Sequence, residues 1–176
     1  MNPLAKTLPL AACAIVAALA LAPIAGAKIV PNKSIGGVSL NQSYASVTDK
    51  LGTGGGAQFG DEPSDYQIIY EKLGLSVSWL SGLEEGAETV EPLPDDKVFF
   101  LNTTSTKERD SKGVGPGVTS RTAKRRLIGE KCSKIFDADR RVEVEQCVTN
   151  KMGKVSTTYV LRKGKVLEVS MNNIDF

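Results

Sequence analysis

The 176-residue chain carries 22 basic and 20 acidic side chains and contains no histidine. Because histidine is the commonest general base and the commonest metal ligand, its absence excludes Ser-His-Asp and Cys-His catalytic sites. Aromatic residues make up only 6% of the chain, while 17 glycines and several β-branched runs are present. This composition is typical of sheet with short helices rather than of a helical bundle.

The first 27 residues have the features of an export signal. Lys6 is their only charged side chain, an apolar stretch runs from Leu8 to Leu21, and Pro23 precedes a triplet of small residues that ends at Ala27. This arrangement predicts a signal peptide over residues 1–27, cleaved after about Ala27. The expected location is therefore secreted or in the cell envelope.

Two alternatives remain open for this segment. The stretch from Leu8 to Ala27 approaches the length of a membrane-spanning helix, which would make it an uncleaved anchor, but prolines lie at both ends. The residues from Leu10 to Cys13 have the spelling of a lipid-attachment box, but the chain stays apolar after Cys13, where a mature lipoprotein would turn polar. Cleavage is preferred, and the cleaved protein is not expected to span a membrane.

Cys132 and Cys147 are the cysteines that remain once Cys13 leaves with the signal. An even number of cysteines in an exported protein indicates a disulfide. Closing a loop of about 15 residues would stabilise the fold by about 3 kcal/mol. Two free buried thiols are the alternative.

One local pattern occurs twice, 76 residues apart. Residues 37–51 and 113–127 each begin with a glycine-valine turn and continue into a short amphipathic helix. Ser43 and Thr119 occupy the same place in the two copies, and both are expected to cap a helix N-terminus. The second copy follows the first closely enough to predict a tandem repeat.

Alternating apolar and polar residues predict about three strands after each helix, with Lys163-Gly164 as a tight hairpin turn. The predicted strands are 66–70, 75–79, 97–103, 142–148, 157–162 and 165–171. The expected fold class is α+β, with an N-terminal linker at 28–34 and two tandem repeats at 35–106 and 107–176. We expect one curved sheet with the helices on one face.

The glycine-valine turn, the polar N-cap, the helix exit at Leu51-Gly52 and the late cysteine pair resemble secreted actinobacterial proteins built like the beta-lactamase inhibitory protein. Each half is also similar to the small outer-membrane lipoprotein domain of the barrel-assembly machinery. This resemblance covers most of residues 35–171 and implies a tandem helix-plus-sheet fold whose exposed sheet face binds another protein without catalysis. It implies no particular partner, and Pro116 stands where the first copy has Leu40.

Other chemistries have weaker support. The pairs Ser111-Lys112 and Ser133-Lys134 contain a nucleophile and a base, but adjacent residues on a strand or helix point apart. The glycine-rich residues 51–56 follow a helix, where a phosphate-binding loop would precede one, so they are interpreted as a helix exit.

Carboxylates occur in four turns, where they would suit a glycoside hydrolase or a weak calcium site. These turns are Asp61-Glu62, Glu84-Glu85, Asp95-Asp96 and Asp137-x-Asp139. Carboxylates in turns are usually solvated, and no loop has the ligand spacing of a known calcium site. No cofactor or metal is expected.

Charge is distributed unevenly along the chain. Residues 28–100 hold 5 basic and 11 acidic side chains, whereas residues 101–176 hold 16 and 9. The densest basic patch consists of Arg121, Lys124, Arg125 and Arg126. It is a candidate site for an anionic wall polymer, with a solvated helix face as the alternative. Nucleic-acid binding is not expected, because too few aromatics lie nearby to stack bases.

Tyr66, Tyr70 and Trp79 are candidate anchors for a protein interface, with core packing the stronger interpretation for Trp79. The sequence as a whole therefore predicts a secreted, non-enzymatic binding module for an extracellular or envelope protein. The alternatives are an envelope hydrolase that uses turn carboxylates and a structural wall-associated protein.

Overall fold

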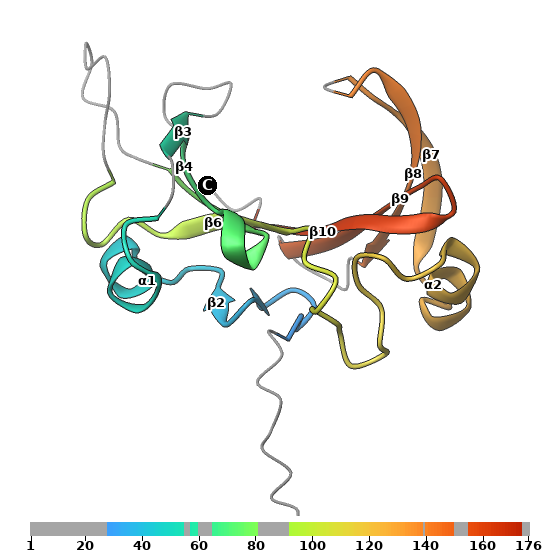
Figure 1. Cartoon of the computed structure of the whole chain (residues 1–176), viewed down its shortest axis with the longest axis horizontal. Coiled ribbons are helices and arrows are strands. Elements are labelled where there is room, and N and C mark those ends of the chain that lie inside the picture. The colour runs from blue at the N-terminus through green and yellow to red at the C-terminus, as the bar shows by residue number, and fades with distance from the viewer. Residues whose placement is uncertain are drawn as a thin grey trace, which may run out of the picture.

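The computed structural model describes residues 28–54, 57–59, 65–80, 92–138, 140–149 and 155–173. Within these ranges the chain forms ten strands, two short α-helices and one 3₁₀ turn (Figure 1). In chain order they are β1 (Ser34–Ile35), β2 (Val38–Ser39), α1 (Tyr44–Leu51), β3 (Ala57–Phe59), β4 (Asp65–Tyr70), η1 (Glu71–Leu73), β5 (Leu75–Leu80), β6 (Val98–Thr103), α2 (Ser120–Arg126), β7 (Lys131–Asp137), β8 (Val142–Thr149), β9 (Val155–Arg162) and β10 (Lys165–Asn173). The predicted signal peptide lies outside the described residues.

Eight of the strands form one antiparallel sheet, in the order β3-β4-β5-β6-β10-β9-β8-β7. The strands before α2 fill one half of the sheet and those after α2 fill the other, and β6 pairs with β10 where the halves meet. Figure 1 shows that the sheet is curved, with both outer ends rising on the side away from the helices. β1 and β2 form a separate two-stranded ribbon.

The predicted fold class of two tandem units, each with one helix and about three strands, is wrong. The described chain is mostly sheet, and its α-helices have only 8 and 7 residues. Each half supplies four strands, and all eight are hydrogen-bonded into one continuous sheet with a separate ribbon beside it. The prediction missed strands because β3 and β7 lie at the sheet edges, where a strand needs no alternating apolar pattern.

The predicted N-caps are confirmed. The Ser43 hydroxyl accepts a hydrogen bond from the Ser46 amide, and the Thr119 hydroxyl accepts one from the Thr122 amide, both at 3.3 Å. These bonds satisfy amides that the first helical turn leaves unpaired. The predicted starts of both helices therefore agree with the structure.

A basic side chain also ties each helix to the turn before it. Lys50 donates to the carbonyl of Gly37 at 2.7 Å, and Arg126 donates to the carbonyl of Gly113 at 3.0 Å. Both glycines have positive φ angles, 75° and 70°, which residues with a side chain rarely adopt. The positive φ angle at this position explains why both glycine-valine turns in the sequence begin with glycine.

The core lies between the sheet and the layer that contains both helices. One row of directly opposed residues crosses seven strands on this face, and all but its last member are buried. The row is Tyr70, Leu75, Thr103, Val169, Tyr159, Cys147 and Cys132. Tyr44 of α1 packs edge-on against Trp79, with ring centroids 5.2 Å apart, and Ala123 of α2 is fully buried in the same cluster.

The six predicted strands correspond to β4, β5, β6, β8, β9 and β10. The predicted hairpin turn at Lys163-Gly164 is also present, with φ angles of 49° and 77° at its two residues. Successive left-handed residues of this kind are typical of the tight turns that suit the twist of two antiparallel strands. These local predictions agree with the structure although the predicted fold class does not.

Candidate functional site

The sheet face opposite the helices is lined by short polar side chains. Because directly opposed residues point to the same face, the strand register defines a second row that crosses seven strands beside the core row. This row is Ile69, Ser76, Asn102, Ser170, Thr158, Val148 and Lys131. Every member except exposed Lys131 is half-buried. We call the side of the sheet that carries this row the open face.

A parallel row on the open face adds an aromatic group at its centre. It consists of Gln67, Ser78, Phe100, Asn172 and Ser156. The centroids of the Phe100 and Phe99 rings lie 6.4 Å apart, and both residues are half-buried. Phe99 lies where the register between β5 and β6 shifts, so it has no directly opposed partner on β5. The centre of the open face is therefore uncharged, and the one charged residue in the two rows, Lys131, lies on the edge strand.

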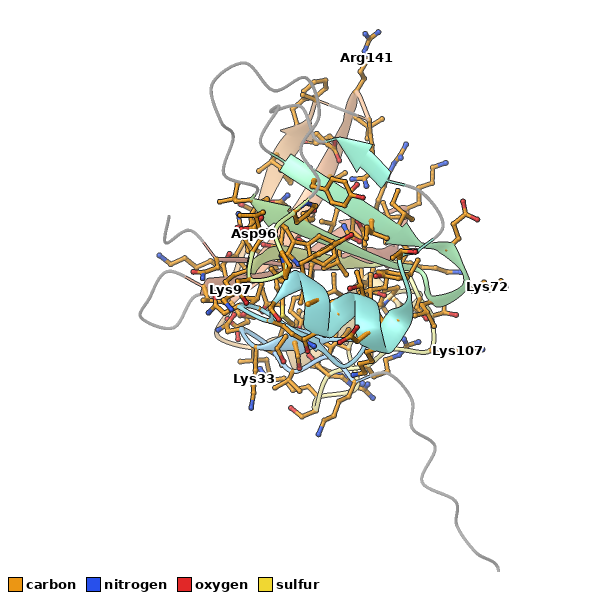
Figure 2. All side chains as sticks on the ribbon, turned by 90° about the vertical axis from the view of Figure 1, so that its left-hand side faces the viewer. Lys33, Lys72, Asp96, Lys97, Lys107 and Arg141 are labelled. Atoms are coloured by element: carbon orange, nitrogen blue, oxygen red, sulfur yellow. A yellow bond between two sulfur atoms is a disulfide. The ribbon has the colours of Figure 1, made fainter. Side chains whose placement is uncertain are left out.

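An ion pair between Arg140 and Glu168 lies at one end of the sheet, near the turn between β7 and β8. Arg140, in the turn between β7 and β8, donates two hydrogen bonds to the buried carboxylate of Glu168, at 2.6 and 3.2 Å. It also donates to Asp137 at 2.7 Å. The bond to Asp137, and with it the charge of Glu168, raises the pKa of Arg140 above its usual range, against the opposing effect of burial. Figure 2 places the neighbouring Arg141 at the far end of the molecule from Lys33.

The three aromatic residues proposed as interface anchors are core residues. Tyr66, Tyr70 and Trp79 are 7%, 6% and 0% exposed and face the helices rather than the open face. Burial raises the pKa of Tyr70 to about 12, and its hydroxyl donates to the carbonyl of Gly52. A partner cannot contact these rings without opening the core, so the prediction of an aromatic interface is corrected in favour of core packing.

The predicted basic patch is exposed along α2, but two of its members are engaged within the chain. Lys124 forms an ion pair with Glu145 at 2.6 Å, and Arg126 holds the carbonyl of Gly113. Lys124, Arg125 and Arg126 all lie in the last turn, where cations are favoured by the helix dipole. Arg121 lies in the first turn and is exposed.

Two of the three predicted turn carboxylates that the structure describes hold the backbone, and the third, Asp95, is exposed. Asp96 accepts from the Leu93 amide at 2.7 Å, and Asp137 accepts from the Arg140 amide at 2.9 Å. The other predicted acidic positions, Asp61, Glu62, Glu84, Glu85 and Asp139, lie outside the described residues. Within the described ranges no three metal-binding side chains gather closely enough to hold an ion.

The serine-lysine pairs do not form a nucleophile-base arrangement with one another. Lys112 forms an ion pair with Glu130 at 3.7 Å, and Lys134 forms one with Glu143 at 3.7 Å. The glycine-rich segment begins as the predicted helix exit, because the amide of Gly52 donates to the carbonyl of Thr48 at 2.7 Å and closes α1. Gly55 and Gly56 lie outside the described residues.

Two buried carboxyl groups on the core side were not identified from the sequence. Asp110 accepts from the amides of Lys112 and Val114 and from the hydroxyl of Tyr159, all at 2.7 to 2.8 Å. Glu108 is 1% exposed, and its Oε2 atom has no hydrogen-bond partner within the described part of the chain. Burial raises the pKa of Glu108 to about 7, partly opposed by a hydrogen bond with Thr103.

The predicted disulfide is confirmed. Cys132 and Cys147 lie directly opposite each other on β7 and β8, with an S–S distance of 2.04 Å. A disulfide is consistent with a protein that works in an oxidising compartment outside the cytoplasm. Over the parts of the chain that the structure describes, no helix has the length and apolar character needed to cross a bilayer.

Comparisons with known proteins add a fold relationship and little else. No protein-family model matches the chain, and no curated protein matches it. The structure is similar to the crystal structure of a DUF4309 family protein (YjgB) from Bacillus subtilis, with a TM-score of 0.50, 10% sequence identity, and 79% of this chain and 84% of that chain covered. At this identity the likeness concerns the fold alone, and the resemblance to inhibitor-type proteins stays a prediction.

The resemblance implied a binding sheet face, but the residues of the open face were not identified from the sequence. Its serine, threonine and asparagine residues carry no catalytic or metal-binding signal, and such residues are equally common in turns. The available signal was their alternation with apolar residues, which was visible for Ser76 and Ser78 in the predicted strand 75–79, whereas Ser156 and Asn172 lie just outside the predicted strands. Knowing that these positions align across the sheet required the strand order.

Proposed function

We propose that this protein is a secreted or envelope-located binding module, without catalytic activity, that holds a segment of another protein on the open face of its sheet. The observation that supports this most is the pair of rows that crosses the sheet on the side away from the helices and carries no charge except Lys131 on the edge strand. The disulfide between Cys132 and Cys147 supports a location of the protein outside the cytoplasm.

The composition of the open face favours a protein over a charged polymer. Interface centres in protein complexes are depleted of charge and enriched in aromatic residues. Phe99 and Phe100 lie among serine, threonine, asparagine and glutamine side chains, and the charged groups Lys131 and Arg140 lie toward the β7–β8 end. The small side chains also allow the backbone of a partner to approach closely, so that amide and hydroxyl groups can donate to it or accept from it.

Binding is favoured over hydrolysis because four of the described carboxylates already have structural roles. Asp96 and Asp137 hold turns, Asp110 holds Tyr159 and two amides, and Glu168 holds Arg140. A hydrolase would instead need two carboxyl groups facing each other across a substrate cleft. A hydrolase would show turnover that a single Asp or Glu substitution abolishes.

Site-specific crosslinking tests the proposal. A photoreactive phenylalanine analogue placed at Phe100 should crosslink to one discrete protein in culture supernatant or envelope extract, whereas the same analogue at Asp49, exposed on α1, should not. Asn102→Arg should weaken capture of that protein by about tenfold or more, because it introduces a charge at an uncharged interface centre. Asp49→Arg is the matched control and should leave capture unchanged.

The opposite results would reject the proposal. Equal adducts from both positions would mean that contacts at Phe100 are not specific. Full capture by Asn102→Arg would mean that the partner binds elsewhere. Release of the protein from the envelope by high salt alone, with no adduct at either position, would favour the structural wall-associated alternative.

A further inference from the structure

Two adjacent cavities flank the turn between β9 and β10. The larger, of about 340 Å³, is lined by the cations Arg162, Lys163 and Lys165 together with the hydroxyl-bearing residues Thr104 and Thr106, and no carboxylate lines it. The smaller, of about 200 Å³, shares Arg162 and Lys163 with it. We call these two cavities together the hairpin pocket.

The cations of the hairpin pocket are not neutralised by the carboxylates around them. Glu143 and Glu145 line the smaller cavity, but they form ion pairs with Lys134 at 3.7 Å and with Lys124 at 2.6 Å. Within the described residues no ion pair involves Arg162, Lys163 or Lys165. The pocket therefore keeps an excess of three positive charges, in the half of the chain that is already basic.

The backbone that carries these cations is held in place from both sides. The amide of Ser120 donates to the carbonyl of Gly164 at 2.8 Å, which fixes the hairpin turn against the start of α2. Val166 exchanges 2.8 Å hydrogen bonds with Gly117 and Val118. Because the turn is fixed before any ligand arrives, binding has to order only side chains, which lowers its entropic cost.

We propose that the hairpin pocket binds an anion that carries more than one phosphate or sulfate group. A guanidinium group presents paired donors that match two oxygens of a tetrahedral oxyanion, and ammonium groups supply compact positive charge. The hydroxyls of Thr104 and Thr106, which also line the larger cavity, are additional donors. Three cations spread over two cavities that share Arg162 and Lys163 suit several linked anionic groups better than one. This binding site is distinct from the open face and is independent of the proposed protein partner.

Calorimetric titration of the full-length protein with tripolyphosphate at low ionic strength tests this assignment. The wild-type protein should show saturable binding to one site, and orthophosphate should bind at least about tenfold more weakly because it reaches fewer cations. Lys163→Gln combined with Lys165→Gln should weaken tripolyphosphate binding by about tenfold per lost cation. Arg162→Lys, which keeps the charge but removes the paired donors, should weaken it less.

The matched control is Lys33→Gln combined with Lys97→Gln, which removes the same charge from exposed lysines outside the hairpin pocket (Figure 2). It should leave the affinity within about threefold of wild type, since solvent and salt screen distant charges. Absence of saturable binding, or equal weakening by both pairs of substitutions, would overturn the proposal. Equal affinity for orthophosphate and tripolyphosphate would overturn its requirement for several anionic groups.

Discussion

Glu108 makes stability depend on pH in a direction opposite to that of most carboxyl groups. Its pKa is raised by burial from about 4.5 to about 7, so the folded state holds its proton more tightly than the unfolded state does. The stabilisation is complete below pH 4.5 and is lost as the pH rises to about 7. By the size of the shift, the loss amounts to roughly 3 kcal/mol at most.

Glu108→Gln should abolish this loss, because an amide stays neutral across the range. Urea unfolding midpoints measured between pH 5 and pH 8 should fall for the wild-type protein and stay nearly level for the variant. Glu71→Gln, at an exposed carboxyl group on η1, should keep the wild-type slope. A slope that survives in Glu108→Gln would assign the pH dependence to another group.

Arg140 offers a second test on a single side chain. Its guanidinium group is the described partner of the buried Glu168 carboxylate, at 2.6 and 3.2 Å. Arg140→Ala should destabilise the fold by about 1–3 kcal/mol, because a buried carboxylate is left without its cation. Arg141→Ala removes an equal charge from the exposed tip of the same turn and should cost less than about 0.5 kcal/mol by thermal or urea unfolding.

Adding Glu168→Gln to Arg140→Ala should recover part of that loss, because the uncompensated charge is removed as well. Additive effects of the two substitutions would show that the two side chains do not interact in solution.

Residue-scale features were predictable where the chemistry is local. Ser43 and Thr119 were identifiable as caps because a cap is recognised within three or four residues. Cys132 and Cys147 were identifiable because only two cysteines follow the predicted signal. Trp79, for which core packing was preferred, is buried, but Tyr66 and Tyr70 could not be assigned to a face, because alternation separates the two faces of a strand without saying which one the helices cover.

At the scale of elements, β7 depends on the disulfide more than any other strand. It is an edge strand, paired only with β8, and most of its side chains are exposed. Cys132→Ser combined with Cys147→Ser should destabilise the fold by about 3 kcal/mol, since the two cysteines are 15 residues apart.

Hydrogen exchange can locate this effect. Amide protection in residues 131–137 should fall further than in β9 or β10, because β7 then relies on a single line of backbone hydrogen bonds. A uniform loss of protection over all strands would instead indicate that the disulfide stabilises the fold only globally.

The same element shows why some strands were missed. β7 has two lysines and a serine among its apolar residues. Edge strands commonly carry charged side chains, because these oppose pairing with the strands of other chains. Central strands such as β5 place apolar side chains on the core face and serines on the other face, so their alternation was visible in the sequence. Strand prediction therefore succeeded toward the middle of the sheet and failed at its borders.

At the scale of the whole molecule, the predicted fold class failed because the described chain is mostly sheet, with four strands in each half and α-helices of only 8 and 7 residues. Sequence periodicity located six of the strands, but it contains no information on which strands become neighbours. The contact of β6 with β10, which makes one sheet out of two halves, joins residues as far apart as Phe100 and Asn172. The open face could not be predicted for the same reason, because its rows of residues form only when the two halves of the sheet pair through β6 and β10.

The position of β10 between β6 and β9 has a consequence for how the protein assembles. Pairing of β6 with β10 must close a loop of more than sixty residues, and closing long loops is entropically costly and slows folding. Until β10 arrives, β6 and β9 each present a row of unsatisfied amides and carbonyls to other chains. A newly synthesised molecule is therefore most vulnerable to aggregation just before β10 is inserted.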